Sequence, residues 1–431
     1  MTRKPVTSPR GEHPLQSMSS YLGGFPPRIP RFIMEQYVPA RTTVLDPFCG
    51  AGTTLVEARL SGRRTVGVDK NPLAVALSRA KLASVDLDQV CARIDELAYD
   101  FPGEVALDPD SENIRIIFHP RTLAQLCYLR DALDPAREAD AFLIGSILGI
   151  MHGKMRKGGG SAYLSIDMPN TFSMSPDYVR KFVKKHRLVQ PSIDVFYQLR
   201  QRAAWLLRSG ALPDQPAATV IEGDATNLPA LLKTAGLRTI GAVVTSPPYL
   251  GILRYGAFNW IRLWFLRQTQ QQVDRLLDGT DSMDVYLSFM ATFFDSLSKV
   301  TKPGAVAAMV IGDVVENGQY VQLAKRLWEE LGEMFPFEVM GMIEDGYDNH
   351  SKTTRIWGEG RKGRATPKDH ILIMRRVSSA HAIRNQSAVK DIVPIATPRT
   401  AGDTHRHHDL ATRKAPPNNR LQRTVRCAAR R

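Results

Sequence analysis

Short apolar runs rich in β-branched residues alternate with helical patterns along most of this chain, and that alternation constrains its fold more than any other feature. Seven runs have the length of strands: residues 42–48, 64–69, 218–223, 240–245, 305–311, 337–343 and 370–374. Helical periodicity between them occupies residues 53–60, 72–82, 285–300 and 321–335. This order predicts an α/β fold in which helices cover both faces of a parallel sheet. The last two runs have no helical pattern between them, which predicts an antiparallel hairpin at the sheet edge.

The long connection between the second and third runs has helical patterns of its own. They lie at residues 88–100, 122–133, 139–152 and 193–208, and a glycine-rich basic loop occupies 153–161. Long connections without structure are uncommon in compact domains, so residues 87–216 are predicted to form an inserted helical subdomain. After residue 377 the apolar periodicity ends, and residues 377–431 are predicted to form a disordered basic tail.

The formal charge of +14 is concentrated in two segments. Residues 151–190 contain eight Lys or Arg against two Asp or Glu, and residues 376–431 contain twelve against three. A local basic patch is expected where a protein binds a polyanion such as nucleic acid. A solvated charged surface is the alternative that charge alone leaves open.

Several classes of protein are disfavoured. The four cysteines are far apart and form no CxxC pair, so neither a disulfide framework nor a cysteine zinc site is expected. The most apolar stretch, residues 139–151, is shorter than the roughly 20 residues that cross a bilayer and is predicted to be a buried helix. The N-terminus lacks the apolar core of a signal peptide. We therefore expect a cytoplasmic protein without a metal site or a membrane anchor.

A glycine turn follows the first predicted strand, in the sequence Asp46-Pro-Phe-Cys-Gly-Ala-Gly-Thr-Thr54. Gly50 and Gly52 allow a tight turn and a close approach of a ligand to the backbone. The helix that begins near Thr53 offers free N–H groups at the same place. A glycine turn between a strand and a helix is the setting of a nucleotide or nucleoside site.

Acidic residues end the next two predicted strands. Asp69 comes about 20 residues after the glycines, where a carboxylate can accept both ribose hydroxyls. Asp224 could accept the exocyclic amine of an adenine. A helix N-cap is the alternative role for each of them.

The most specific feature is Thr245-Ser-Pro-Pro-Tyr249, directly after the fourth predicted strand. Two prolines fix the backbone, and the Ser246 hydroxyl and Pro247 carbonyl can both accept hydrogen bonds. Tyr249 adds a flat ring on which a base could stack. Two rigid acceptors beside an aromatic ring suit an exocyclic amino group on a nucleobase.

Together, the sequences DPFCGAGTT and TSPPY resemble those of the S-adenosylmethionine-dependent DNA amino-methyltransferases, which methylate N4 of cytosine or N6 of adenine. The resemblance implies a Rossmann-like, seven-stranded class I methyltransferase sheet with an antiparallel last strand. The catalytic core would comprise residues 42–86 and 217–376, and residues 1–41 would pack on the cofactor site. The insertion 87–216 is the candidate for target recognition.

The resemblance also implies roles for individual residues. S-adenosyl-L-methionine would be the cofactor, held at Phe25, Asp46, Phe48, Cys49, Gly50, Gly52, Thr53, Asp69 and Asp224. The catalytic loop would be Ser246, Pro247, Pro248 and Tyr249. Phe25 belongs to residues 21–27, which resemble the aromatic and proline-rich element that packs on the cofactor methionine in this family.

Double-stranded DNA is the expected substrate, with the target base flipped out of the helix. Phosphate contacts are expected at Lys154, Arg156, Lys157, Lys352 and Arg355. Serine before Pro-Pro-Tyr favours cytosine N4, with adenine N6 as the alternative. A catalytically inactive scaffold that binds nucleic acid is the alternative from another class. The sequence leaves open whether a cognate restriction endonuclease accompanies the protein.

Overall fold

The computed structural model describes residues 12–107, 112–154, 162–169, 172–214, 216–248, 250, 254–277, 279–316, 319–346, 368–378 and 393–394. The chain divides into two units, Met1–Ile395 and Ala396–Arg431, and every described residue belongs to the first. Most of the predicted basic tail therefore lies outside the described residues. Within it, Val393–Pro394 form a short strand, β10.

An eight-stranded sheet lies at the centre of the first unit. Its other strands are β1 (Val44–Asp46), β2 (Thr65–Asp69), β3 (Ala218–Glu222), β4 (Ile240–Thr245), β5 (Thr301–Gly312), β8 (Phe337–Gly346) and β9 (Lys368–Arg376). The spatial order is β10-β8-β9-β5-β4-β1-β2-β3. Strands β1 to β5 are parallel to one another, and β9 is antiparallel to both β5 and β8. The predicted α/β fold, with seven strands and an antiparallel last one, is confirmed, and β10 is an addition to it. The predicted hairpin β8–β9 is antiparallel, but β9 lies inside the sheet rather than at its edge.

The helices surround this sheet on both faces and extend into the insertion. They are α1 (Arg28–Tyr37), α2 (Thr53–Leu60), α3 (Pro72–Leu82), α4 (Leu87–Tyr99), α5 (Pro120–Ala132), α6 (Glu138–Ile150), α7 (Pro176–His186), α8 (Val195–Leu206), α9 (Leu228–Thr234), α10 (Tyr255–Phe265), α11 (Gln270–Leu277), α12 (Met283–Val300) and α13 (Leu323–Leu331). A small hairpin, β6 (Val314–Glu316) and β7 (Gln319–Val321), follows β5.

Side chains of successive strand residues enter different apolar clusters. Val44 packs with α1 residues such as Ile33, while Leu45 packs in the cluster that contains α9, α12 and α13. Val243 and Val244 of β4 divide in the same way. Because neighbouring strand residues point to opposite faces, a sheet buried on both sides needs continuous apolar runs, as the sequence has here.

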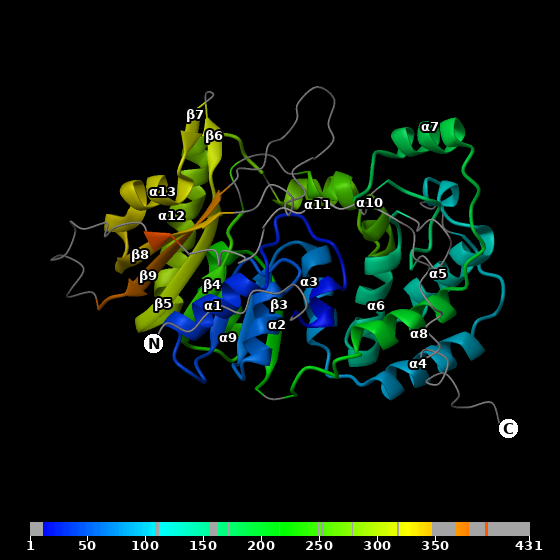
Figure 1. Ribbon diagram of the computed structural model, residues 1–431, viewed down its shortest axis with the longest axis horizontal. Coiled ribbons are helices and arrows are strands. Elements are labelled where there is room, and N and C mark those ends of the chain that lie inside the picture. The colour runs from blue at the N-terminus through cyan, green and yellow to red at the C-terminus, as the bar shows by residue number, and fades with distance from the viewer. Residues whose placement is uncertain are drawn as a thin grey trace, which may run out of the picture. The chain divides into compact units, whose positions relative to one another are not determined.

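The insertion between β2 and β3 contains α4 to α8, which gather on one side of the sheet (Figure 1). It does not have a core of its own, because its buried residues share one apolar cluster with α2, α3 and α10. The predicted buried helix at 139–151 is α6, which is buried nearly all round. No described helix is long and apolar enough to cross a membrane.

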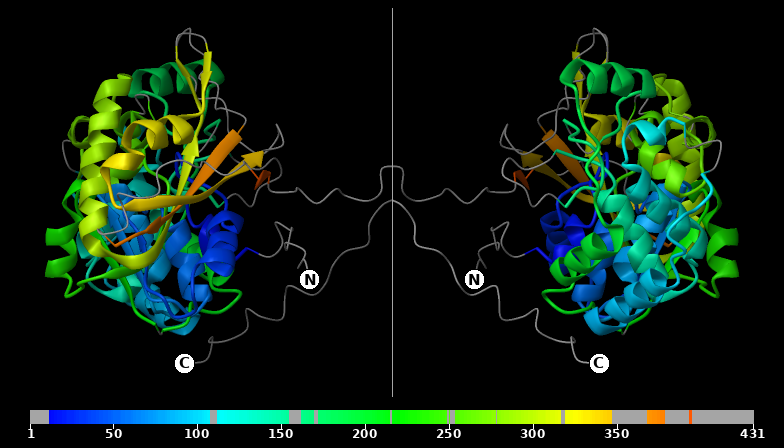
Figure 2. Two further views of the ribbon diagram at one scale, coloured as in Figure 1. Left: turned by 90° about the vertical axis from the view of Figure 1, so that its left-hand side faces the viewer. Right: turned by 90° about the vertical axis from the view of Figure 1, so that its right-hand side faces the viewer.

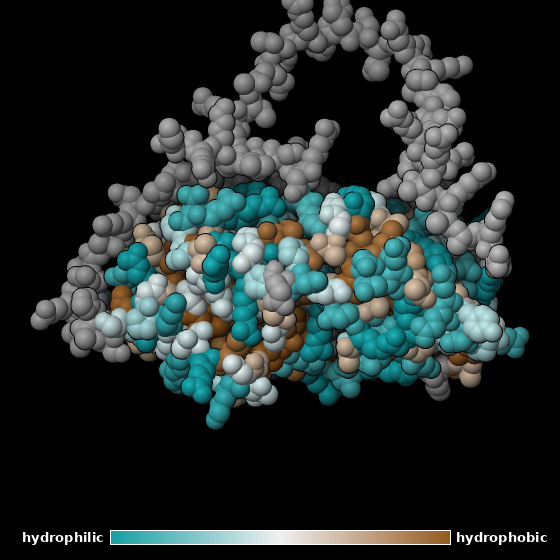
Figure 3. All heavy atoms as spheres, turned by 90° about the horizontal axis from the view of Figure 1, so that it is seen from below, coloured by the Kyte–Doolittle hydropathy of each residue, from teal (hydrophilic) through white to brown (hydrophobic). Residues whose placement is uncertain are grey.

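The carboxyl ends of the strands face the part of the molecule where α7 also lies. The hairpin β6–β7 continues from the carboxyl end of β5, and it and α7 occupy the same end in all three views of the ribbon (Figures 1 and 2). On the face seen in Figure 3, apolar side chains reach the surface in patches among hydrophilic ones.

Candidate cofactor and catalytic site

A cavity of about 650 Å³ lies at the carboxyl ends of β1 to β4. Its walls come from the loops after these four strands, from the N-terminal segment before α1, and from residues of α10 to α12. Cavities of this volume hold ligands of cofactor size. The topology thus places the two sequence motifs, which are almost 200 residues apart, on one cavity.

The glycine turn after β1 has the geometry that its sequence predicted. Gly50 and Gly52 have φ angles of 50° and 76°, and Gly52 is the N-cap of α2. A Cβ on Gly50 would lie 3.1 Å from the Tyr21 ring, and one on Gly52 would lie 2.9 Å from Ser78 Oγ. Both the conformation and the space therefore favour glycine at these positions. The turn lines the cavity along Phe48, Cys49, Gly50, Ala51 and Thr53.

Asp69 lies at the tip of β2 and faces the cavity. It accepts hydrogen bonds from the backbone N–H of Gly50 at 2.8 Å and of Asn71 at 2.9 Å. The alternative role of helix cap falls to Asn71, whose side chain accepts from Leu73 N. Burial raises the pKa of Asp69 to about 6, although these hydrogen bonds oppose the shift.

Asp224 combines two roles. It caps the short 3₁₀ helix Ala225–Asn227 by accepting from Thr226 N at 2.9 Å and Thr226 Oγ1 at 2.8 Å. It also pairs with Lys70 Nζ at 3.3 Å and lines the cavity. Burial acts to raise the pKa of Asp224, but the hydrogen bonds from Thr226 and the charge of Lys70 lower it overall. Asp224 is therefore a fixed carboxylate at the tip of β3.

Of the predicted cofactor residues, Asp46 and Gly52 do not line the cavity. Asp46 is buried beneath the glycine turn, where it accepts from Thr245 Oγ1 at 2.6 Å and Phe48 N at 3.2 Å. Burial raises the pKa of Asp46 to about 6. Since Thr245 directly precedes Ser246, Asp46 ties the cofactor turn to the catalytic loop without lining the cavity.

Ser246, Pro247 and Pro248 follow β4 and line the cavity. The Ser246 hydroxyl donates to the Val310 carbonyl of β5 at 2.9 Å. A hydroxyl oxygen that donates its hydrogen in this way still has lone pairs that can accept hydrogen bonds. Tyr249 lies outside the described residues.

The N-terminal segment covers the cavity and contributes Phe25 and Tyr21 to its wall. Tyr21 Oη accepts from Asn71 Nδ2 at 3.0 Å, and its ring lies against Gly50 and 6.0 Å from the ring of Tyr255. Tyr255, from α10, also lines the cavity and was not predicted. No sequence signal marked it, because its place depends on how α10 packs.

Two arginines hold this covering segment from other parts of the fold. Arg202 of α8 donates through Nη2 to the carbonyls of Ser17 at 2.7 Å and Met18 at 2.8 Å. Arg262 of α10 donates to Ser20 O at 3.1 Å and Ser20 Oγ at 2.9 Å. Burial lowers the pKa of each to about 10. Sequence patterns did not indicate either residue, since their partners are backbone carbonyls distant in the chain.

Of the residues predicted to contact DNA, Lys154 is described and is exposed. Arg156, Lys157, Lys352 and Arg355 lie outside the described residues. The basic segment 151–190 includes α7, on which Lys181, Lys184 and Lys185 are exposed. Rings of Tyr178, Phe182 and His186 follow one another along α7, with centroid separations of 5.9 and 4.4 Å.

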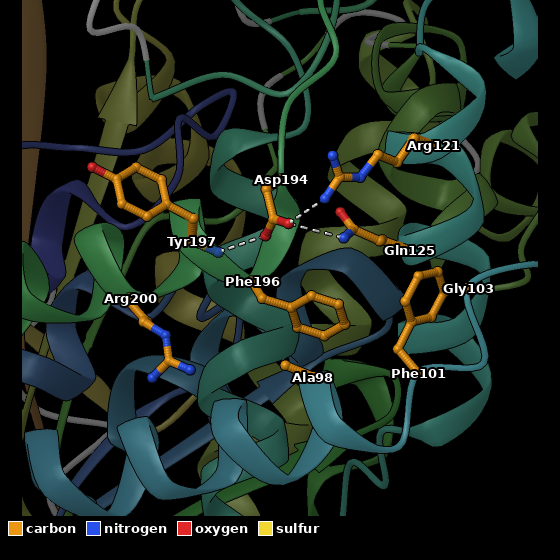
Figure 4. Close-up of a pocket in the computed structure, with 9 residues that line it drawn as sticks. All are labelled: Ala98, Phe101, Gly103, Arg121, Gln125, Asp194, Phe196, Tyr197 and Arg200. Atoms are coloured by element: carbon orange, nitrogen blue, oxygen red, sulfur yellow. Dashed lines mark hydrogen bonds and ion pairs between the residues drawn. The ribbon is translucent and has the colours of Figure 1, made fainter. Parts of the chain in front are cut away.

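A second cavity, of about 610 Å³, lies in the insertion between α4, α5 and α8 (Figure 4). Its carboxylate, Asp194, is already engaged by Tyr197 N at 2.9 Å, Arg121 Nη2 at 3.2 Å and Gln125 Nε2 at 3.3 Å. The two cavities are similar in volume, but they differ in how the polar groups of their walls are bound. In the insertion cavity, Asp194 is bound by other residues of the cavity wall. In the first cavity, the polar groups of the wall include those of the two predicted motifs and of the tips of β2 and β3. Among the described residues, no cluster of His, Cys, Asp or Glu could hold a metal ion.

The sheet order, with one antiparallel strand inside a parallel array, and the cavity at its strand tips define a Rossmann-like class I methyltransferase fold. The family described as DNA methylase matches residues 4–79, which include the glycine turn and Asp69. The resemblance to the S-adenosylmethionine-dependent DNA amino-methyltransferases is thereby confirmed, and S-adenosylmethionine is the methyl donor that this family and fold imply.

Three relatives are each described as a Type II methyltransferase. Type II methyltransferase M.BsoBI of Geobacillus stearothermophilus is 22% identical over 361 residues, covering 76% of this chain and 67% of that protein. M.MvaI of Kocuria varians is 22% identical over 270 residues, 57% of each chain, so the match spans little more than half of that relative. M2.DpnII of Streptococcus pneumoniae is 32% identical over 71 residues, 16% of this chain and 26% of that protein.

Solved structures overlap the chain with low scores. TrmN from Thermus thermophilus has a TM-score of 0.33 at 9% identity and covers 84% of this chain and 52% of its own. The rRNA methyltransferase aviRa from Streptomyces viridochromogenes has a TM-score of 0.31 at 15% identity, covering 83% and 89%.

The residues present fit S-adenosylmethionine. Glycines at positions 50 and 52 allow the tight turn that borders the cavity, and Asp69 offers a carboxylate at the tip of β2 where a ribose is expected. Phe48 forms an apolar wall, with its ring 4.8 Å from that of Phe293.

Proposed function

We propose that this protein is a DNA methyltransferase that acts on an exocyclic amino group, with N4 of cytosine as its target. The observation that carries the proposal is that Ser246 and Pro247 line the same cavity as Gly50 and Asp69. A nucleoside cofactor held at the glycine turn would therefore lie beside the residues suited to an amino group.

The chemical difficulty is that the amino nitrogen of a base is a weak nucleophile, because its lone pair is delocalised into the ring. Ser246 Oγ, whose hydrogen is donated to the Val310 carbonyl, can accept one amino proton, and the Pro247 carbonyl can accept the other. These two hydrogen bonds localise the lone pair on nitrogen and orient it. The cofactor supplies the electrophilic methyl group.

The choice of cytosine rests on the serine itself, which is more typical of the cytosine enzymes in the family that the chain resembles. Adenine N6 is the alternative, and it requires the same two acceptors. The relatives named above are described as Type II methyltransferases, which supports DNA as the substrate.

Helix α7 supports the same substrate. It lies at the end of the molecule where the strand tips open (Figures 1 and 2), and it combines exposed lysines with a row of aromatic rings. Lysines bind phosphates without regard to sequence, while aromatic rings can stack on bases or pack against sugars. We infer that the segment 151–190 contacts DNA beside the target base.

The test is transfer of labelled methyl groups from S-adenosylmethionine to unmethylated genomic DNA, with product nucleosides identified by mass spectrometry. Ser246→Ala should lower the rate about 100-fold, because one of two fixed acceptors is lost. Ser298→Ala is the matched control: it removes a hydroxyl that also donates to a backbone carbonyl, that of Asp295 at 2.8 Å, and it should leave the rate unchanged.

Each product has a distinct meaning. N4-methylcytosine supports the proposal, and N6-methyladenine keeps the mechanism but replaces the base. Label in RNA alone would contradict DNA as the substrate. Absence of S-adenosylhomocysteine binding in calorimetry would favour the inactive nucleic-acid-binding scaffold.

A further inference from the structure

Lys81 is a buried cation on the wall of the cofactor cavity. It lies in the last turn of α3, its exposed fraction is 1%, and it lines the cavity. Its Nζ is 3.5 Å from the carbonyl of Gln16, and among the described residues no carboxylate lies within ion-pair distance of it. Burial lowers the pKa of Lys81 to about 8. Buried charges are costly unless they are paired, so this ammonium group is suited to an anion that enters the cavity.

The surroundings place Lys81 beside the glycine turn. Ser78, one turn earlier on α3, donates to the carbonyl of Gly50 at 2.8 Å. Gln16, whose carbonyl faces Lys81 Nζ, donates through Nε2 to the carbonyl of Thr53 at 3.2 Å. The ammonium group is thus linked to the first turn of α2, where free N–H groups also favour negative charge.

The neighbouring acid on α2 is already neutralised by other partners. Glu57 accepts from Arg31 Nε at 2.9 Å and from Gln16 Nε2 at 2.9 Å. Among the described residues, three carboxylates line the cavity. Asp69 and Asp224 stand at the tips of β2 and β3 and are held by Gly50, Thr226 and Lys70. Glu12 lies in the N-terminal segment, where burial and the charge of Glu57 raise its pKa. Lys81 forms no ion pair with any carboxylate of the described residues, so its charge is available to an anion that enters the cavity.

We propose that Lys81 is the counter-ion of the α-carboxylate in the methionine part of the cofactor. This inference rests on S-adenosylmethionine being the cofactor. The adenosine part carries no negative charge, and the single carboxylate lies at the methionine end, which the glycine turn would border. An ion pair of this kind depends on the negative charge of the ligand. The site should therefore bind ligands that have the methionine carboxylate more tightly than ligands that lack it.

The experiment is calorimetric titration of the full chain with S-adenosylhomocysteine and with its decarboxylated analogue, 5′-deoxy-5′-(3-aminopropylthio)adenosine. The wild type should bind the analogue about 10- to 100-fold more weakly, as expected for loss of a hydrogen bond between charged groups. Lys81→Met should weaken S-adenosylhomocysteine to a similar extent and leave the analogue nearly unaffected. That non-additive pattern identifies a direct pairing.

Two controls keep the result interpretable. Methionine is close to lysine in length and removes the buried charge together with the long 3.5 Å contact of Nζ with the Gln16 carbonyl, so the melting temperature of Lys81→Met should change little. Lys233→Met, on the exposed face of α9, should leave both affinities unchanged.

The inference is overturned if Lys81→Met weakens both ligands equally or neither of them while the wild type binds S-adenosylhomocysteine. In that case the cofactor assignment stands without it. A wild type that binds neither ligand overturns both the cofactor assignment and this inference.

Discussion

The strand tips and helix α7 present polar groups to their ligands in different ways. At the tips, Asp69 and Ser246 are held by hydrogen bonds to the backbone before any ligand arrives. On α7, Lys184 and Lys185 project into solvent. The first arrangement recognises a ligand by fixed geometry, so a substitution that changes the shape of the site should lower ligand affinity strongly. If α7 contacts DNA as proposed, the second acts through the number of charges, and a change should appear mainly as a dependence on salt.

The largest effect is expected at the glycine turn. Gly52→Val should weaken S-adenosylhomocysteine binding by 100-fold or more, since a branched side chain is strained at φ 76° and would meet Ser78 Oγ at 2.9 Å. Calorimetry measures the loss. Gly236→Val is the matched control, because Gly236 has φ 70° but open space around it. Equal losses in both variants would show that backbone strain alone, and not the cavity, accounts for the effect.

A smaller effect, with a pH signature, is expected at Asp69. Accepting ribose hydroxyls requires the ionised carboxylate, and burial raises the pKa of Asp69 from its ordinary value near 4 to about 6. As the pH falls through about 6, the carboxylate becomes protonated and affinity for S-adenosylhomocysteine should fall. A separate loss of affinity as the pH rises through about 8 would belong to deprotonation of Lys81. Asp69→Asn should bind about 10- to 100-fold more weakly near pH 7 and lose the dependence on pH near 6. An unchanged pH profile in the variant would assign the titration to another group.

The strand tips were predictable from the sequence because the patterns that mark them are local. Strand runs, glycine spacing and residues after strands are local patterns, and parallel strands bring their carboxyl ends together whatever lies between them. The fold and the placing of Gly50, Asp69 and Ser246 on one edge therefore followed from sequence. Asp46 was expected to contact the cofactor, but its burial beneath the turn depends on its bond to Thr245, almost 200 residues away.

Buried cations were the least accessible to prediction. Lys81, Arg202 and Arg262 occur in helices whose patterns are compatible with an exposed charged face. What buries them is the packing of α3, α8 and α10 against the N-terminal segment, and that packing has no periodic signal. Helix α7 also escaped prediction as an element, since only Val179 of its residues is buried.

On α7, a charge reversal should act on DNA affinity and leave cofactor affinity unchanged. The double variant Lys184→Glu/Lys185→Glu should lower DNA affinity about 10-fold near 0.1 M salt and reduce the slope of log K against log salt by about 2. Fluorescence anisotropy at several salt concentrations measures both quantities.

The matched control changes the same number of charges elsewhere. Lys233 and Lys299 are exposed near the amino ends of β4 and β5, away from the strand tips. If Lys233→Glu/Lys299→Glu reduced the slope equally, net charge rather than α7 would govern binding.

The smallest effect should come from Arg202, which connects the insertion to the segment that covers the cofactor cavity. It belongs to α8 of the insertion, yet it binds the carbonyls of Ser17 and Met18, which belong to the segment that covers the cofactor cavity. Arg202→Met leaves two carbonyls without their donor. Because such a loss costs about 1–3 kcal/mol, we expect a melting temperature lower by a few degrees and S-adenosylhomocysteine binding weaker by several-fold.

Arg202 both binds the covering segment and lies over the Trp205 ring, and Arg208→Met tests the second contact without the first. Both guanidinium groups lie over the Trp205 ring, at 4.8 Å for Arg202 and 4.1 Å for Arg208, but Arg208 is exposed and does not hold the covering segment. Its variant should therefore leave cofactor affinity unchanged. If Arg202→Met lowered the melting temperature without weakening the cofactor, the insertion would support the fold while remaining energetically separate from the cavity. A parallel loss of both would mean that the insertion, although it lies outside the sheet, helps to preorganise the site where the methyl donor binds.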